Sequence, residues 1–323
     1  MRLASIGTSG ICEHFLNAAA SVPGIELYAV YSRDPERGEA FRQKYHAKKQ
    51  YNDLTALASD PEIDAVYIAS PNALHVRQSV VLLNFGKHVL CEKPATTTLI
   101  QYMKLSELAA KRGIIYAEAI MSIHTPAFSV LNNALKEIGR IRSATIDFCQ
   151  LSSKYPAYLK GENPNIFNPE FETGCLMDIG VYNLYLAAAL FGQPERIQSS
   201  AVFLENGADA AGSALLHYKD MTATLTYSKV AQSFSPSEIL GDLGTIRIAS
   251  VSQLTGIELM TKTETKTLVP FEIPRKDVMA AEAAYFRDCV EKGNHPSRSF
   301  AEHTACTVRE MCDEIRRQNG FPF

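Results

Sequence analysis

The stretch RLASIGTSGICEHFLNAAA, residues 2–20, decides the fold. Residues 2–7 form a short apolar run, and a loop of small residues then leads into a helical pattern over 11–22. A strand that enters a helix through a glycine-containing loop is typical of a dinucleotide-binding unit. The fingerprint G-x-G-x-x-G has Ser9 and Cys12 at its second and third glycine positions here. The loop alone therefore leaves a plain strand-to-helix turn as an equal alternative.

The same alternation of short apolar runs and helical patterns continues to about residue 118. Strands are predicted at 2–7, 26–32, 65–70, 88–92 and 114–118, with helices at 11–22, 35–46, 52–58, 73–85 and 98–112. Apolar strands separated by helices form a parallel sheet that is covered on both faces. We therefore predict an α/β chain whose residues 1–119 form a Rossmann-type cofactor-binding domain.

The pattern changes after residue 120. A helix at 126–139 and a strand at 140–151 precede a polar, aromatic loop at 152–173, an apolar helix at 176–191, and a run of strands between 196 and 272. Strands in succession with short turns predict a mostly antiparallel sheet. Helical patterns at 277–292 and 301–318 close the chain. We predict an α+β domain over 120–323 for substrate binding and oligomerisation, with an open-faced sheet and a last helix able to pack on the first domain.

The composition excludes several function classes. A net charge of -3 without a basic block argues against nucleic-acid or membrane partners. No apolar run reaches the roughly 20 residues of a membrane span, and the N-terminus lacks a signal-peptide layout. The seven cysteines are scattered and form no CxxC pair, which argues against a zinc ribbon or a disulfide framework. We therefore expect no metal site and a reducing cytoplasmic location.

The ends of the first two predicted strands carry the candidate cofactor residues. A helix beginning near residue 11 would direct free N–H groups toward a pyrophosphate, so the loop candidates are Gly7, Thr8, Ser9, Gly10 and Ile11. The second strand ends in Ser32, Arg33 and Arg37, where NAD-binding chains usually have an acid. A hydroxyl and two guanidiniums favour the 2′-phosphate of NADP, with NAD possible. The alternative is that both arginines are solvated and pair with Asp34 or Glu36.

The third predicted strand ends in Ser70, Pro71 and Asn72, where ligands of such folds bind. Asn72 could hydrogen-bond the cofactor, cap the helix that follows, or do both. His75 joins the cofactor-binding candidates in a supporting role rather than a catalytic one.

The fourth strand ends in the stretch HVLCEKPATT, residues 88–97. Strand ends usually close with Gly, Asn or Asp, so folding gives no reason for Glu92, Lys93 and Pro94 to stand at this place. The plain alternative is a surface lysine at a turn.

With GCLMDIGVYNLYLAAALFG at 174–192, these features make the chain resemble the glucose–fructose oxidoreductase, inositol dehydrogenase and rhizopine-catabolism (Gfo/Idh/MocA) family over essentially its whole length. Tyr182 stands where histidine-type members have His, which is similar to the dimeric dihydrodiol dehydrogenases. The resemblance implies that Lys93 faces the nicotinamide and the substrate oxygen, that Glu92 and Pro94 fix the turn, and that the Lys–Pro bond is often cis.

The second anchor of the resemblance is the Asp-x-Gly-x-Tyr pattern. Asp178 and Tyr182 are four residues apart and share one face of a helix. The resemblance implies that Lys93 and Tyr182 handle the proton at the substrate oxygen while Asp178 orients Lys93 or binds substrate hydroxyls. From spacing alone, a core aromatic would be the preferred interpretation of Tyr182, and the motif favours the catalytic one instead.

The loop at 152–173 offers Tyr155, Asn165 and Phe167 as substrate-binding candidates beside Asp178, because polar groups next to aromatic rings suit a sugar or polyol. For most of its residues a plain surface loop is an open alternative. The expected activity is hydride transfer between a nicotinamide and a secondary alcohol or carbonyl of a sugar, polyol or diol. The rivals are a catalytically silent NADP sensor and a dehydrogenase of an amino-acid or imino precursor, which would need an arginine-rich clamp.

The strand MTATLTYSK, residues 221–229, bears on assembly. One face holds Ala223, Leu225 and Tyr227, and the other holds threonines. The threonine face could be solvated, or it could pack on an identical sheet. Because the resemblance implies association through this face, we expect a homodimer or tetramer through the 196–262 sheet.

Overall fold

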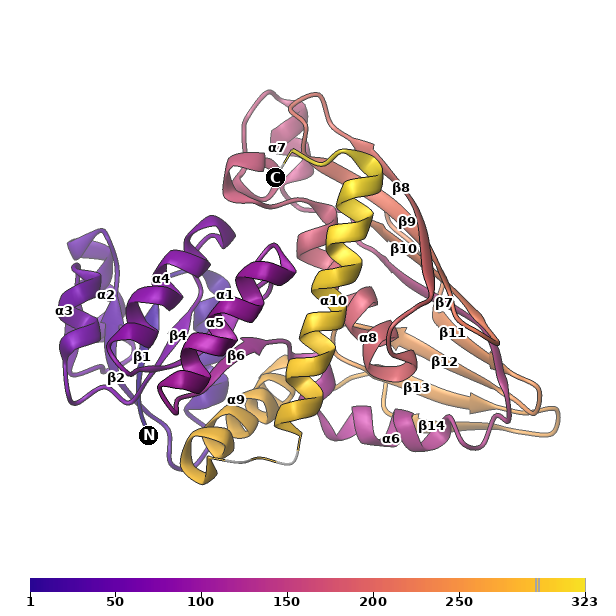
Figure 1. Ribbon diagram of the computed structural model, residues 1–323, viewed down its shortest axis with the longest axis horizontal. Coiled ribbons are helices and arrows are strands. Elements are labelled where there is room, and N and C mark those ends of the chain that lie inside the picture. The colour runs from indigo at the N-terminus through magenta and orange to yellow at the C-terminus, as the bar shows by residue number, and fades with distance from the viewer. Residues whose placement is uncertain (294, 296, 323) are drawn as a thin grey trace. The chain divides into compact units, whose positions relative to one another are not determined.

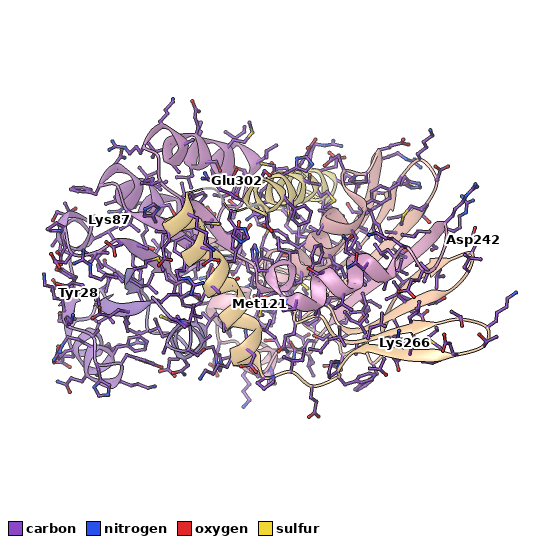
Figure 2. The ribbon with its side chains drawn as sticks, turned by 90° about the horizontal axis from the view of Figure 1, so that it is seen from below. Tyr28, Lys87, Met121, Asp242, Lys266 and Glu302 are labelled. Carbon is purple, nitrogen blue, oxygen red and sulfur yellow. The ribbon has the colours of Figure 1, made fainter. Side chains whose placement is uncertain are left out.

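The computed structural model describes residues 1–293, 295 and 297–322, which form two compact units. The first unit comprises Met1–Ile120 and Pro274–Glu302, and the second comprises Met121–Ile273 and the residues from His303 onward. Figure 2 labels Met121 and Glu302, where the chain passes between the units. The first unit thus passes to the second after Ile120, and residues 274–302 lie in the first unit.

The first unit is a six-stranded parallel sheet with the order β3-β2-β1-β4-β5-β6. Its strands are β1 (Arg2–Ile6), β2 (Glu26–Tyr31), β3 (Lys49–Tyr51), β4 (Ala65–Ile68), β5 (His88–Glu92) and β6 (Tyr116–Ala119). Its helices are α1 (Gly10–Ala19), α2 (Pro35–Lys44), α3 (Leu54–Ser59), α4 (Asn72–Asn84), α5 (Leu99–Lys111) and α9 (Arg275–Lys292). The Rossmann-type prediction is confirmed. Strand β3 was missed because its sequence KQY has no apolar run.

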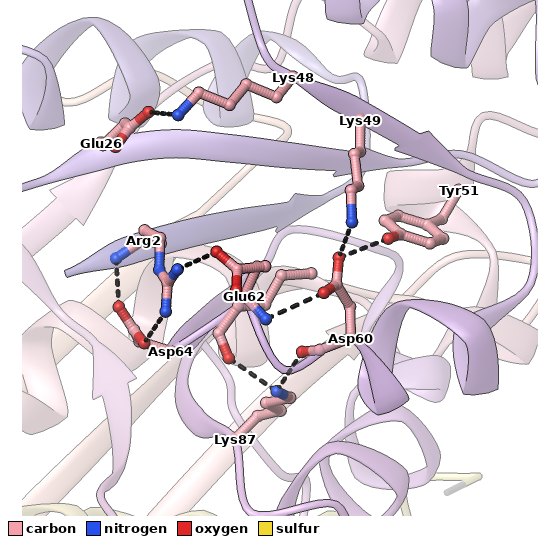
Figure 3. A network of polar contacts seen from close by, with 10 residues as sticks. Arg2, Glu26, Lys48, Lys49, Tyr51, Asp60, Glu62, Asp64 and Lys87 are labelled. Atoms are coloured by element: carbon pink, nitrogen blue, oxygen red, sulfur yellow. Dashed lines mark hydrogen bonds and ion pairs between the residues drawn. The ribbon is translucent and has the colours of Figure 1, made fainter.

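The strand order places the ligand-binding edge of this unit. It reverses between β1 and β4, and ligands of doubly wound sheets bind beyond the carboxyl ends of the strands at that point. The opposite edge is closed by the polar network of Figure 3, in which Lys87 donates to the carbonyl oxygens of Asp60 and Ile63 at 2.6 and 2.7 Å. Burial would raise the pKa of Asp60, but hydrogen bonds from Lys49 and Tyr51 lower it to about 2. This edge is therefore occupied by its own charges, which leaves the carboxyl edge for a ligand.

The second unit is built on an eight-stranded sheet with the order β14-β13-β12-β11-β7-β10-β9-β8. The central pair β7 and β10 is parallel and the other neighbours are antiparallel, so the sheet is mixed and mostly antiparallel. The strand SEILG at β11 was not predicted. The strands are β7 (Ile141–Cys149), β8 (Arg196–Phe203), β9 (Asp209–His217), β10 (Thr222–Ser228), β11 (Ser237–Gly241), β12 (Thr245–Ser250), β13 (Thr255–Met260) and β14 (Thr265–Val269).

Helices α6 (Pro126–Ala134) and α8 (Val181–Phe191) and the second-unit part of α10 (Arg298–Asn319) lie on one face of this sheet (Figure 1). Ala223, Leu225 and Tyr227 of β10 point to that face and are fully buried, as predicted. Tyr227 packs so closely on Gly180 that a Cβ there would lie 3.0 Å from its ring. This contact explains the glycine of the Asp-x-Gly-x-Tyr pattern, because a larger residue would push the helix off the sheet.

The apolar helix predicted at 176–191 begins as a π-helical turn, Leu176–Gly180, and continues as α8. The longer stretch Pro169–Phe191 is the one segment of the described residues that is long and apolar enough to cross a membrane. Its apolar window is 78% buried inside the protein, as in a core helix. The preceding loop contains a short helix, α7 (Tyr155–Leu159), and 3₁₀ turns at Asn165–Phe167 and Pro169–Phe171.

Candidate functional site

The loop between β1 and α1 has the features of a phosphate cradle. Gly7 has φ +112°, and a Cβ at this position would lie 2.5 Å from the carbonyl oxygen of Ala69, so only glycine fits. A Cβ added at Gly10 would meet no heavy atom within 4 Å, so the space beside this residue is open. Ser9 precedes α1 and forms no side-chain cap, which leaves the first N–H groups of the helix to an anion. These features fit the pyrophosphate of a dinucleotide.

The end of β2 supplies the candidates for the 2′ position. The Asp34 carboxylate accepts hydrogen bonds from the backbone N–H groups of Glu36 and Arg37 at 3.0 and 3.2 Å, and so begins α2. The Arg37 guanidinium donates to Thr8 Oγ1 at 3.1 Å. Arg33 is exposed. The contact between Arg37 and Thr8 brings the candidates for the 2′-phosphate next to the glycine loop. A single dinucleotide could therefore reach both.

The turn after β5 presents one lysine from a buried frame. Cys91 and Glu92 before it and residues 94–97 after it are buried, whereas Lys93 is half-buried. The peptide bond between Lys93 and Pro94 is cis. Glu92 accepts a hydrogen bond from the Tyr67 hydroxyl, and burial raises the pKa of Glu92. The groups around the lysine thus fix the turn, and the lysine is its half-buried member.

His75 ties this turn to the end of β4. Its Nδ1 lies 2.9 Å from the carbonyl oxygen of Pro94, and its Nε2 lies 2.8 Å from that of Ser70. Burial lowers the pKa of His75, and the two carbonyl contacts act in the opposite direction. The predicted supporting role fits this position. Pro71 is the N-cap of α4 and Asn72 its first residue, so of the two roles left open for Asn72 the structure does not give it the N-cap position.

Asp178 lies in the second unit, in the π-helical turn that begins the apolar helix. Its carboxylate forms an ion pair with Lys229, which follows β10. The Lys229 side chain is 5% exposed and the Asp178 side chain 26% exposed. The carboxylate is therefore the more accessible half of the pair. The structure gives Asp178 a cationic partner that sequence reasoning had not considered.

Tyr182 lies one helical turn after Asp178 and is 7% exposed. Its ring meets that of Phe148 edge to face, with the centroids 5.8 Å apart. The next residue, Asn183, donates to the carbonyl oxygens of Ile146 and Thr226 at 3.3 and 2.8 Å. These bonds fasten α8 to the parallel pair β7 and β10 and so fix the direction of Tyr182.

The aromatic residues of the 152–173 loop cluster together. The Tyr155 ring lies 5.9 Å and the Tyr158 ring 5.7 Å from that of Phe167. Phe167 is fully buried, so it holds the loop from inside, while Tyr155 is half-buried. Asn165 is exposed, and its carbonyl oxygen accepts from Thr173 Oγ1 at 2.7 Å. Next to the cluster is a cavity of about 730 Å³, lined by Tyr155, Tyr158, Leu159, Gly161, Glu162, Asn163, Phe203, Leu204, Glu205 and Asn206.

A second acid, Asp209, supports the helix that carries Asp178. Its Oδ2 accepts the backbone N–H of Leu176 at 2.6 Å, and it packs so tightly on Gly174 that a Cβ there would clash with it. Burial raises the pKa of Asp209 to about 6, although Lys229 and the backbone N–H groups lower it. Neither Lys229 nor Asp209 was found from the sequence, because neither belongs to a local motif.

The raised pKa makes a prediction about stability. An unfolded Asp has the lower ordinary pKa, so ionising Asp209 lowers the free energy of unfolding as pH rises from about 4 to about 6, by about 2–3 kcal/mol in total. Asp209→Asn keeps an acceptor for Leu176 and removes this cost. The melting temperature of the variant relative to wild type should therefore rise across this pH range and stay level above it. A difference that does not depend on pH would contradict the assignment.

Among residues 1–293, 295 and 297–322, no group of three or more His, Cys, Asp or Glu side chains is placed to hold a metal ion. The seven cysteines are free thiols.

Comparison with known proteins follows the division of the chain. Residues 1–119 match the model described as "Oxidoreductase family, NAD-binding Rossmann fold", and residues 134–247 match the "GFO/IDH/MocA C-terminal domain". The chain is 36% identical over 323 residues to scyllo-inositol 2-dehydrogenase (NADP(+)) IolU of Bacillus subtilis, covering 100% of this chain and 98% of that protein.

Two further comparisons cover nearly the whole chain. Trans-1,2-dihydrobenzene-1,2-diol dehydrogenase of Danio rerio is 28% identical, covering 92% of this chain and 90% of that protein. The solved structure of KijD10, a 3-ketoreductase from Actinomadura kijaniata in complex with NADP and TDP-benzene, has a TM-score of 0.85 and 26% identity. It covers 99% of this chain and 98% of that one.

Proposed function

The chain belongs to the GFO/IDH/MocA oxidoreductase family, and from this premise we propose that it is an NADP-dependent dehydrogenase of a sugar, polyol or diol. The observation that carries the proposal is the turn at Lys93. A half-buried lysine stands between buried residues at the carboxyl end of β5, the strand next to the edge strand β6. A general acid or base must reach its substrate while its surroundings hold it in place.

The residues at the carboxyl edge of the first unit fit the cofactor. The first N–H groups of α1 and the open space beside Gly10 suit the pyrophosphate. Arg37, held against Thr8, and the exposed Arg33 suit a 2′-phosphate. The bound cofactor supplies a hydride acceptor or donor at nicotinamide C4. The half-buried Lys93 belongs to the same edge because the sheet is parallel throughout.

The proton at the substrate oxygen is assigned to Lys93 and Tyr182. Lysine and tyrosine side chains can both hold a proton at a reacting oxygen. Asp178 accepts hydrogen bonds from substrate hydroxyls, since its carboxylate is the accessible half of its ion pair. Tyr155, at the cavity of the 152–173 loop, offers a ring and a hydroxyl to the substrate.

A panel of inositols, sugars and diols, incubated with the protein and NADP⁺ and followed by nicotinamide absorbance, tests the proposal. NADPH formation with at least one hydroxyl compound supports it. A protein that binds NADPH but turns over no member of the panel in either direction behaves as a sensor and refutes it.

The uncovered face of the eight-stranded sheet supports a homo-oligomer. Figure 1 shows no described helix on this face. Its exposed residues include Val202 of the edge strand β8, at 59% exposure, and Thr224 of the central strand β10. We expect a dimer, or a tetramer built from dimers, so light scattering after size-exclusion chromatography should give at least twice the 35.6 kDa chain mass. A monomer at micromolar concentration would exclude this assembly.

The seven free thiols suit a cytoplasmic location.

A further inference from the structure

Lys229 is held rigidly at a junction of the second unit. Its backbone N–H donates to the carbonyl oxygen of Ala210 at 2.9 Å, and its carbonyl oxygen accepts from the N–H of Ser152 at 2.9 Å. Its ammonium nitrogen lies 5.9 Å from the centroid of the buried Phe167 ring. The residue thus joins the neighbour strand β9, the start of the 152–173 loop and the aromatic cluster inside that loop.

The environment of its ammonium group is unusual for a lysine. Lysine side chains are almost never fully buried unless they are paired, and this one is 5% exposed and paired with Asp178. Taking an ammonium out of water costs several kcal/mol, and an opposite charge with good geometry offsets that cost. Nearby titratable groups are the buried Asp209 and Cys175 and the half-buried Cys149, and burial raises the pKa of each of them. Tyr182 follows Asp178 by one helical turn.

We propose that Lys229 is a positioning residue that keeps Asp178 ionised and directed outward, and that the site therefore takes an uncharged, hydroxyl-rich substrate. Two observations carry this. The ammonium of Lys229 is more buried than the carboxylate, so at this pair the substrate meets the acceptor oxygens of Asp178 rather than the ammonium of Lys229. The charge of Lys229 is already matched by Asp178, so it cannot also neutralise a substrate carboxylate. The inference rests on the proposed function, which it narrows to neutral polyols.

A double-mutant cycle on the apo protein tests the pairing without any substrate. Asp178→Asn leaves an unpaired buried ammonium and should lower the melting temperature by at least about 5 °C. Lys229→Met leaves the more accessible carboxylate and should cost less. The double variant should lose much less melting temperature than the two single variants lose together, because neither charge remains. Strictly additive losses would overturn the pairing. Lys111→Met removes an exposed lysine–Glu107 pair and should change the melting temperature by no more than about 1 °C.

Steady-state kinetics test the positioning role. A neighbouring cation favours the ionised form of a carboxylate, so in Lys229→Met the acid limb of kcat/KM should move up by about one pH unit. Lys229→Arg, which retains the charge, should keep the limb near that of wild type even if turnover falls. Affinity for NADPH should stay unchanged in both variants. A merely structural lysine would lower activity without moving the acid limb, and an unmoved limb would overturn the proposal.

Comparing a neutral polyol with the corresponding sugar acid shows whether the role of Lys229 or the dehydrogenase activity itself is wrong. Wild type should prefer a neutral polyol by at least about 100-fold in kcat/KM over the corresponding sugar acid. If wild type oxidises the sugar acid equally well, the inference fails while the proposed function stands. If it oxidises neither while the cycle still shows the coupling, the proposed function fails and the pairing stands.

Discussion

Replacing Lys93 with methionine is expected to lower kcat by about 100- to 10,000-fold, the range typical of a removed general acid or base. Methionine has nearly the length of lysine and no proton to give. The frame around it includes the Tyr67–Glu92 hydrogen bond and the two His75 contacts, none of which is formed by the lysine side chain. The affinity for NADPH should therefore change little, since the lysine acts on the transition state more than on the bound cofactor.

The measurement pairs turnover with calorimetric titration of NADPH. Lys104→Met, an exposed lysine on α5 of the same unit, serves as the matched control and should retain full turnover. A Lys93→Met protein that keeps more than about a tenth of wild-type kcat would remove this residue from the proton-transfer role.

Replacing both Arg33 and Arg37 with alanine is expected to weaken NADP binding about 100-fold and to leave NAD binding nearly unchanged. Each charge-assisted hydrogen bond contributes about 1.5 kcal/mol or more, and 1.4 kcal/mol is a tenfold change in affinity. Losing two bonds to a 2′-phosphate gives the stated effect, whereas a cofactor with a free 2′-hydroxyl loses neither.

Titration of both cofactors into wild type and the double variant decides the matter. Arg112→Ala is the control, because this exposed arginine follows α5 at the opposite edge of the sheet, where its guanidinium donates to Asn84 Oδ1 at 3.1 Å. Equal affinities of wild type for NADP and NAD, or a double variant with unchanged preference, would show that the two arginines do not read the 2′ position.

Much of the first unit could be predicted because its signals are local. The loop at Gly7 and the turn at Lys93 are short motifs at strand ends, and a parallel sheet brings all strand ends to one edge. The polar strand β3 was not predicted, because it pairs with β2 through its backbone and its sequence contains no apolar run. That residues 274–302 belong to the first unit was not predicted for a different reason. No local sequence signal shows which core an amphipathic helix joins.

The substrate side was harder to predict because its contacts are long-range. Asp178 was found through its motif, but its partner Lys229 lies 51 residues away, directly after a strand whose alternation only separates its two faces. Asp209 accepts a hydrogen bond from the N–H group of Leu176, which lies 33 residues before it in the sequence. Phe167 was expected to touch substrate, and the structure places it in the interior of the loop. Composition identified an aromatic loop but could not say which ring points inward.

The most direct test of the account follows the hydride itself. The protein is incubated with NADP⁺ and the most active polyol of the panel, deuterated at its carbinol carbons, and the NADPH formed is analysed by mass spectrometry. The account predicts NADPH that carries one deuteron, formed by wild type and suppressed in Lys93→Met. Unlabelled NADPH, or no NADPH from any polyol, would contradict direct hydride transfer from a carbinol carbon and with it the proposed function.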